Sequence, residues 1–121
     1  MQTAKAPKSI GPYSQGIASS GFVFTAGMIG LDPQTGKIVG PGIREQTQRA
    51  LESIRAILEE AGTSLARVVK TTVYIKEAEL FSEVNEVYST FFHEHRPARS
   101  TVVCSFMQAE VLVEIDAIAE V

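Results

Sequence analysis

Three short segments of the chain carry side chains whose types could do chemistry. Tyr13 follows a Gly-Pro turn near the start of the sequence, and Arg99 stands just after a rigid proline. Glu114 lies inside an otherwise hydrophobic predicted strand. An arginine presents a planar fork of donors that suits a carboxylate, and a carboxyl group can accept and return a proton. Each residue also has an ordinary structural explanation, as a loop tyrosine, a surface cation and the solvent-facing acid of an edge strand.

Other motifs point away from phosphate and metal chemistry. Gly30 and Gly36 enclose five residues rather than the four of a phosphate-binding loop, so we interpret this segment as a turn. His93 and His95 offer two imidazoles with no evident third ligand, and we expect no metal site. Cys104 has no CxxC partner and no histidine near it in the sequence, which favours a small buried side chain over a nucleophile.

Hydrophobic periodicity predicts the elements that must position these residues. The expected order is β-β-α-β-α-β-β, a two-layer α+β sandwich forming a single domain over residues 1–121. The predicted strands cover residues 16–18, 22–29, 68–76, 100–107 and 111–119, and the predicted helices cover 43–61 and 80–92. Gly62 is expected to stop the first helix, and Pro97 limits the second.

The strand pattern also predicts a partner for the sheet. Two helices can cover only one sheet face, yet Phe22 and Phe24 alternate with Val23, so apolar groups occur on both faces. In so short a chain, a second copy of the same chain is the economical cover. We therefore expect a closed homo-oligomer.

Composition narrows the classes of protein. A net charge of −3 and 7% aromatic residues argue against a nucleic-acid partner. A single cysteine fits a reducing compartment. The longest mainly apolar stretch has eleven residues, against the roughly twenty that span a membrane, and no basic-then-apolar leader precedes it. We expect a soluble cytoplasmic protein without membrane contact.

Seven segments occur in an informative order along the chain. They are Ile10–Gln15, Phe22–Gly27, Asp32–Gly36, Val69–Val73, Val84-Asn85 with Tyr88, Pro97–Ser100 and Val113–Ala119. Together they resemble the RidA/YjgF family over essentially the whole chain. The resemblance implies a chorismate-mutase-like fold and a homotrimer whose sheets form a central barrel with clefts between subunits. It also implies hydrolysis of reactive enamines and imines, such as 2-aminoacrylate, to 2-keto acids and ammonia.

The same resemblance assigns three catalytic candidates. Arg99 matches the arginine that holds the substrate carboxylate, and Glu114 matches the glutamate that handles the attacking water. Tyr13 matches a tyrosine of the cleft. Because imines hydrolyse in water unaided, orientation and one acid/base group suffice, and we expect no cofactor. Partial desolvation would raise the pKa of the glutamate.

Three further residues are expected to bind the imino or keto acid together with Arg99. Gly27 matches a glycine whose backbone N–H faces the ligand, Asn85 an asparagine early in the second helix, and Thr101 a position where many members have cysteine. Three positions depart from the family pattern, with Ala26 in place of serine, Met28 in place of glutamine and Gln108 in place of proline. These changes leave the carboxylate anchor intact and alter the pocket wall.

A distance argument indicates that the site is shared between subunits. If the last two strands form a hairpin, Cys104 lies opposite Glu114, and Arg99 is roughly 16 Å further along. Both side chains cannot comfortably span that distance. We expect Arg99 and Glu114 of different subunits to make one site.

Two other functions remain open at this point. The arginine cleft could sense a 2-keto acid or another small carboxylate without turnover, as a binding or regulatory protein. Some relatives of this kind have been described as endoribonucleases or translation inhibitors, which the acidic balance and low aromatic content argue against.

Overall fold

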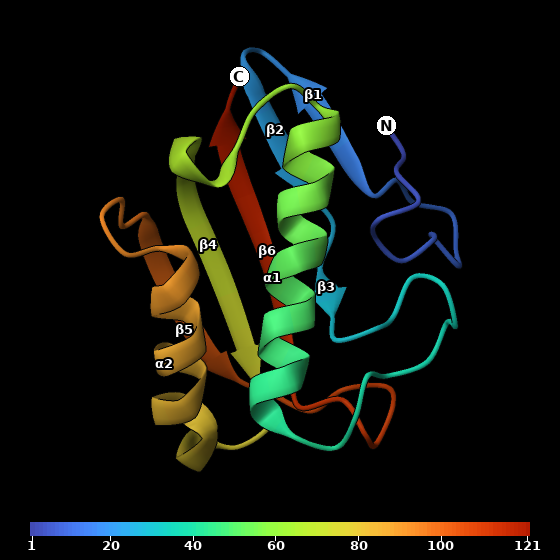
Figure 1. Cartoon of the computed structure of the whole chain (residues 1–121), viewed down its shortest axis with the longest axis vertical. Coiled ribbons are helices and arrows are strands. Elements are labelled where there is room, and N and C mark those ends of the chain that lie inside the picture. The colour runs from blue at the N-terminus through green and yellow to red at the C-terminus, as the bar shows by residue number, and fades with distance from the viewer.

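The computed structural model describes all residues from Met1 to Val121 and contains a six-stranded sheet and two α-helices (Figure 1). The strands are β1 (Gly16–Ser19), β2 (Phe22–Thr25), β3 (Met28–Ile29), β4 (Val68–Ile75), β5 (Ala98–Val103) and β6 (Val113–Glu120), and the helices are α1 (Ile43–Glu60) and α2 (Phe81–Phe91). Short 3₁₀ turns at Leu65–Arg67 and Ala78–Leu80 precede β4 and α2. The predicted α+β order is confirmed, with the short β3 added.

Local turn chemistry fixes the ends of two elements. Ser20 and Gly21 have φ angles of 53° and 84°, the left-handed pair required by a tight two-residue hairpin between β1 and β2. Gly62, at φ 84°, ends α1 as predicted. Its N–H donates to the Glu59 carbonyl, and the N–H of Thr63 donates to that of Leu58, which satisfies two of the last helical carbonyls.

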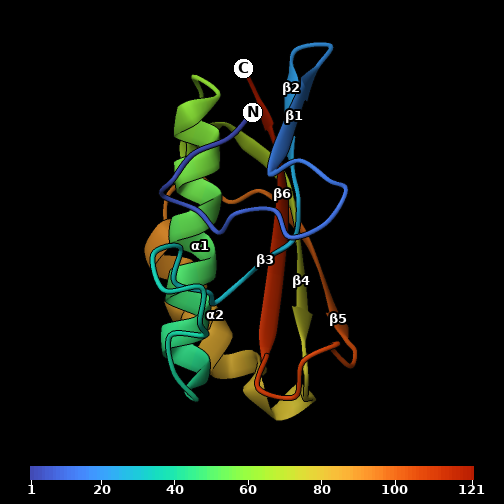
Figure 2. The same cartoon turned by 90° about the vertical axis from the view of Figure 1, so that its right-hand side faces the viewer.

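Both helices lie on one face of the sheet, and Figure 2 shows that no helix covers the opposite face, which we call the bare face. The core forms between α1 and the central strands, where Leu51, Ile54, Val73 and Ile115 are fully buried or nearly so. The alternate residues of β6, from Val113 to Ala119, face this core as the period-two pattern predicts. Neither helix is long and apolar enough to cross a bilayer.

The predicted hairpin between the last two strands is wrong. The sheet order is β1-β2-β6-β4-β5, with β5 parallel to β4 and β6 antiparallel to β4 on its other side. Cys104 extends the β4 pairing, because its N–H donates to the Ile75 carbonyl at 2.9 Å. The cause is the crossover through α2, which returns the chain parallel to β4 and leaves β6 to enter beside it.

The predicted continuous strand over residues 22–29 is interrupted at Ala26 and Gly27. Val23 faces the core before the interruption and Met28 faces it afterwards, so the alternation changes phase between them. The Ala26 N–H donates to the Gln15 carbonyl, which extends the pairing of β1 with β2 by one residue before Gly27. This break exposes the backbone of Gly27 at the sheet surface.

The bare sheet face is apolar over β1 and β2. Ile17 pairs with Phe24, and Phe24 pairs with Ile118, so these three side chains form one row across the sheet. Ile17 is 52% exposed and Phe24 is 41% exposed. Val102 of β5 lies on the same face, through its pairing with Tyr74, and is 44% exposed. An exposed apolar face of this kind is typical of an interaction surface.

Two buried glutamines hold the loops that cross the sheet ends. The Gln15 side-chain amide bonds only main-chain atoms of the N-terminal segment, namely the carbonyls of Thr3, Ala6 and Pro7 and the N–H of Thr3. Gln46 in α1 donates to the Gly40 and Glu110 carbonyls and accepts from the Leu112 N–H, each at 2.9 Å. The loop between β5 and β6 is thereby fixed to α1.

We expect Gln46→Met to lower the free energy of unfolding by about 3 kcal/mol, because it leaves buried backbone groups without partners. Gln48→Met, at an exposed position on the same helix, is the matched control and should change stability by less than about 0.5 kcal/mol. Denaturant unfolding of both variants measures the difference. Equal stabilities would show that the glutamine contacts do not hold the loop.

Candidate functional site

Glu114 lies on the bare sheet face between two strands. Its neighbours across the sheet are Ile29 in β3 and Tyr74 in β4. A Cβ at Gly27 would collide with the Glu114 carboxyl group, with its carbon only 2.8 Å away. Only a glycine in the break after β2 therefore lets the carboxyl pack against the backbone.

A cavity of ≈ 230 Å³ brings three predicted site residues together. Tyr13, Gly27 and Glu114 line it, from the N-terminal loop, the break after β2 and β6 respectively. Its remaining wall is largely apolar and comes from Ile10, Ile29, Phe106, Met107, Gln108 and Val111. The wall thus contains no cation and places one carboxyl group in a largely hydrophobic setting.

The environment of Glu114 favours its protonated form. Burial raises the pKa of its carboxyl group, and the charge of Asp116 raises it further. A carboxyl group with a raised pKa can donate a proton nearer neutral pH than an exposed glutamate can. Burial within the single chain already acts in the direction expected for this residue.

Arg99 lies under α2, on the helix side of β5. Its guanidinium carbon is 4.7 Å from the centre of the Tyr88 ring and 5.5 Å from that of Phe81. The Tyr88 hydroxyl is fixed in turn by a 2.7 Å hydrogen bond with Thr71. Stacking on aromatic rings orients a guanidinium while leaving its N–H groups free. No carboxylate of the chain forms an ion pair with Arg99.

A second cavity, of ≈ 380 Å³, opens beside this arginine. Arg99 and the predicted Asn85 line it together with Tyr88, Ser89, Phe92, Arg96 and Pro97. The Oδ1 atom of Asn85 is buried and has no hydrogen-bond partner in the chain. The cavity therefore offers an oriented cation, whereas the Asn85 Oδ1 atom is closed off from solvent. Thr101, two residues further along β5, lines neither this cavity nor the one at Glu114.

The sheet register separates the two cavities within one chain. Arg99 pairs with Thr71, which is buried beneath the helices, whereas Glu114 pairs with Tyr74 on the bare face. Side chains on opposite faces of a sheet cannot meet around one small ligand. Each chain thus presents two half-sites: a carboxyl half-site (Tyr13, Gly27, Glu114) and an arginine half-site (Asn85, Tyr88, Arg99).

Sequence patterns did not reveal the aromatic bed of the arginine half-site. Phe81 and Tyr88 share a helix face, and apolar residues at this spacing are typical of a core-facing stripe. Phe81 and Tyr88 are seven residues apart on α2, and Arg99 lies near the start of the next strand. This combination indicates an aromatic contact for Arg99 only if β5 is known to run parallel to β4. The apolar wall from Phe106 to Gln108 belongs to an irregular loop and carries no periodic signal.

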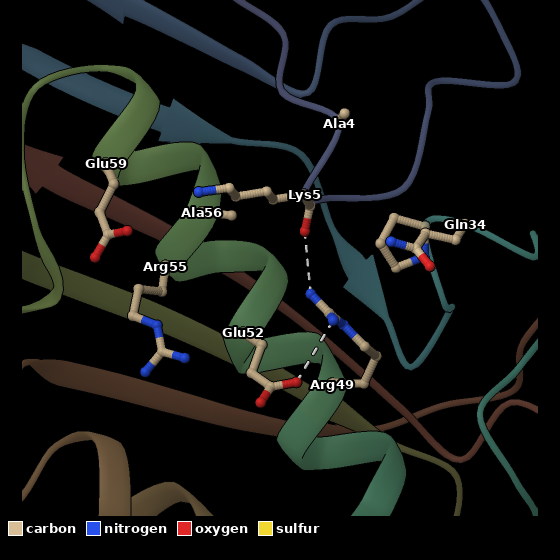
Figure 3. Close-up of a pocket in the computed structure, with 9 residues that line it drawn as sticks. Ala4, Lys5, Gln34, Arg49, Glu52, Arg55, Ala56 and Glu59 are labelled. Atoms are coloured by element: carbon tan, nitrogen blue, oxygen red, sulfur yellow. Dashed lines mark hydrogen bonds and ion pairs between the residues drawn. The ribbon is translucent and has the colours of Figure 1, made fainter.

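A further cavity of ≈ 390 Å³ lies over the outer surface of α1 and contains none of the predicted residues (Figure 3). Arg49 donates to the Lys5 carbonyl at 3.1 Å and lies 3.5 Å from a Glu52 carboxylate oxygen. Of the two arginines that line this cavity, Arg49 is therefore engaged by the chain itself. Its bond to the Lys5 carbonyl attaches the N-terminal segment to α1.

Comparison with known proteins matches residues 3–121 to the family described as Endoribonuclease L-PSP. A RutC family protein of Pyrococcus abyssi is 56% identical over 117 residues, covering 97% of this chain and 92% of the relative. The 2-iminobutanoate/2-iminopropanoate deaminase of Salmonella typhimurium is 42% identical over 120 residues, covering 97% and 93%. The crystal structure of Escherichia coli TdcF with bound serine has a TM-score of 0.93 and 41% identity, covering 99% and 96%.

We expect Glu114→Gln to change how stability depends on pH. Because the pKa of Glu114 is raised, its carboxyl group binds a proton more tightly in the folded state than in the unfolded state, where its pKa is about 4.3. The wild-type free energy of unfolding therefore loses a contribution as pH rises above that value, and the variant does not. Unfolding curves between pH 4 and 7 should show the variant gaining relative stability as pH rises.

The control is Glu60→Gln, at an exposed position at the end of α1. Its stability should follow the wild-type pH dependence. Parallel curves for Glu114→Gln and the wild type would contradict a raised pKa at Glu114.

Proposed function

Because this chain belongs to the RidA/YjgF family, whose members include proteins named imine deaminases, we propose that it hydrolyses 2-imino acids to 2-keto acids and ammonia. The observation that carries the proposal is the Arg99 guanidinium, oriented on two aromatic rings with no carboxylate partner of its own. Such a group suits the planar carboxylate of a 2-imino acid. The substrates of the 2-aminoacrylate and 2-iminopropanoate type arise from pyridoxal-phosphate enzymes.

The proposed chemistry requires one proton-transferring group beside the imine carbon. Glu114 donates its proton to the imine nitrogen as water adds to the C=N carbon, and the resulting carboxylate takes a proton from that water. A second transfer through Glu114 moves the hydroxyl proton of this adduct to the amine nitrogen, the C–N bond breaks, ammonia leaves, and the oxygen from water remains as the keto group. Glu114 is suited to this cycle because its raised pKa makes both protonation states accessible. Tyr13 and the backbone N–H of Gly27 line the same cavity and are placed to orient water or substrate.

A complete site needs two chains in this proposal. The arginine and carboxyl half-sites lie on opposite faces of the sheet, so one chain offers either the anchor or the proton carrier to a given ligand. The apolar row of Ile17, Phe24 and Ile118 supplies a surface for self-association. We propose a homotrimer with its sheets facing one another and its sites between subunits. We place it in the cytoplasm, since its single cysteine, Cys104, is a free thiol.

A second candidate function is ligand binding without turnover. The structure of Escherichia coli TdcF with bound serine favours it, because that relative holds a small amino acid. The same arginine half-site would then hold a small carboxylate as a signal. Saturable binding without accelerated hydrolysis would identify this function. The name Endoribonuclease L-PSP gains no support from the net charge of −3, which provides no broad cationic surface for RNA.

We expect Arg99→Ala to abolish the acceleration of imine hydrolysis, because the substrate carboxylate loses its two-point anchor. Serine dehydratase generates 2-aminoacrylate, and the lag before pyruvate appears measures the added protein's effect. Arg55→Ala is the matched control, since Arg55 also stacks on an aromatic ring, 5.4 Å from the centre of Phe91, but lies outside both half-sites. Unchanged kinetics in Arg99→Ala, with the control also unchanged, would count against the assignment.

A mixing experiment tests whether the site is shared. Arg99→Ala and Glu114→Gln chains should each be inactive alone, whereas refolding them together creates interfaces that combine Glu114 of the first variant with Arg99 of the second. We expect the mixture to recover a substantial fraction of wild-type activity. Sedimentation of each sample verifies that oligomers form. No recovery in well-formed mixed oligomers would place both residues of a working site in one chain.

A further inference from the structure

A second carboxyl group accompanies Glu114 on the bare sheet face. Asp116 lies two residues along β6 and therefore projects from the same face. Tyr74 pairs across the strands with Glu114, and its hydroxyl donates to Oδ2 of Asp116 at 3.0 Å. Tyr74 therefore contacts both acids: its backbone pairs with Glu114, and its hydroxyl group bonds to Asp116.

The charged and titratable groups around this pair favour different protonation states for the two acids. Lys70 in β4 favours ionised Asp116, and the same lysine donates to Ser100 Oγ at 2.8 Å. Burial is the largest influence on Asp116 and leaves the pKa of its carboxyl raised, while the Tyr74 hydroxyl and, to a smaller extent, Lys70 oppose this shift and favour the ionised form. On the side of Glu114, the cavity adds only the Tyr13 phenol.

Cys104, at the end of β5, is the remaining titratable group near Tyr74. The pKa of the Glu114 carboxyl is raised by burial and by the charge of Asp116. When two carboxyls interact, the one with the better donors keeps the negative charge and the other keeps the proton.

We infer that the Tyr74–Asp116 pair is a positioning unit for the candidate reaction: it holds the negative charge on Asp116 and thereby keeps the proton of the two acids on Glu114, which faces the cavity. The inference rests on the proposed function for the acid/base role of Glu114. Two carboxyls in different environments then perform different tasks, one as a fixed charge and one as the proton carrier. Tyr74→Phe would retain the ring but remove the only side-chain hydrogen bond to Asp116.

Carboxyl ¹³C NMR titration of glutamate-labelled protein tests the coupling without relying on activity. We expect Asp116→Asn to move the Glu114 midpoint to lower pH by about one unit, because a neighbouring negative charge is removed. Tyr74→Phe should move it in the same direction by less, since Asp116 then keeps its charge less firmly. Asp116→Glu should restore most of the wild-type midpoint, and Glu60→Gln should leave it unchanged.

The pH profile of kcat for imine hydrolysis should move with the Glu114 midpoint in each variant, while KM, set mainly by Arg99, changes less. An unchanged midpoint in both Asp116→Asn and Tyr74→Phe would overturn the inference. If one variant does not fold, the midpoint in the other decides. If the wild type hydrolyses no imine, the proposed function fails, and an unmoved midpoint still overturns the charge coupling independently.

Discussion

The antiparallel pairing of β4 with β6 determines on which face of the sheet Arg99 and Glu114 lie. Its register sets Ala117 opposite Thr71 on the helix side and Glu114 opposite Tyr74 on the bare side. β5 then adds to the far edge of β4 and inherits the same alternation, which places Arg99 under α2. A shift of the register by one residue would exchange the two faces and bury the carboxyl groups in the core. Chemistry and packing therefore depend on one set of backbone hydrogen bonds.

Each half-site is electrostatically incomplete on its own. The arginine half-site holds a cation without a carboxylate partner, and the carboxyl half-site holds an acid whose neighbour is another acid. A chain selected for stability alone would pair such groups or replace them with apolar residues. An unpaired arginine and a pair of neighbouring acids in a well-packed fold are understandable if each group binds a ligand or contacts another chain. Within the single chain, the Tyr88 and Phe81 rings hold the unpaired Arg99 guanidinium, and the absence of a side chain at Gly27 makes room for the Glu114 carboxyl group.

Much of this arrangement could be predicted from the sequence, because much of it is periodic. The alternation from Val113 to Ala119 identified the buried face of β6, and the α1 stripe with Gly62 identified that helix and its end. Apolar residues at both odd and even strand positions also predicted that the second sheet face needs a partner. In the single chain no helix covers that face. The three catalytic candidates came from motif resemblance, and their meeting in one site stays a prediction.

The rest could not be predicted because alternation does not encode which strands are neighbours. Sequential strands usually pair, and that rule gave the wrong partner for β5; a helix between two strands is the cue for a parallel crossover. The phase change at Ala26 and Gly27 has no signal in the sequence, because the apolar alternation from Phe22 to Met28 continues through it. Pocket walls built from irregular loop residues, such as Met107, depend on tertiary contacts alone.

The hydrogen bonds of the buried Gln15 and Gln46 side chains affect which loop residues can change in evolution. Gln15 and Gln46 grip only main-chain atoms of the loops they hold, so the side chains of those loops contribute nothing to the grip. Loop residues such as Ile10 and Gln108 can therefore be substituted in evolution while the backbone of the loops keeps its path. Ancestral copies could have exchanged pocket linings, and with them the compounds accepted, without redesigning the scaffold.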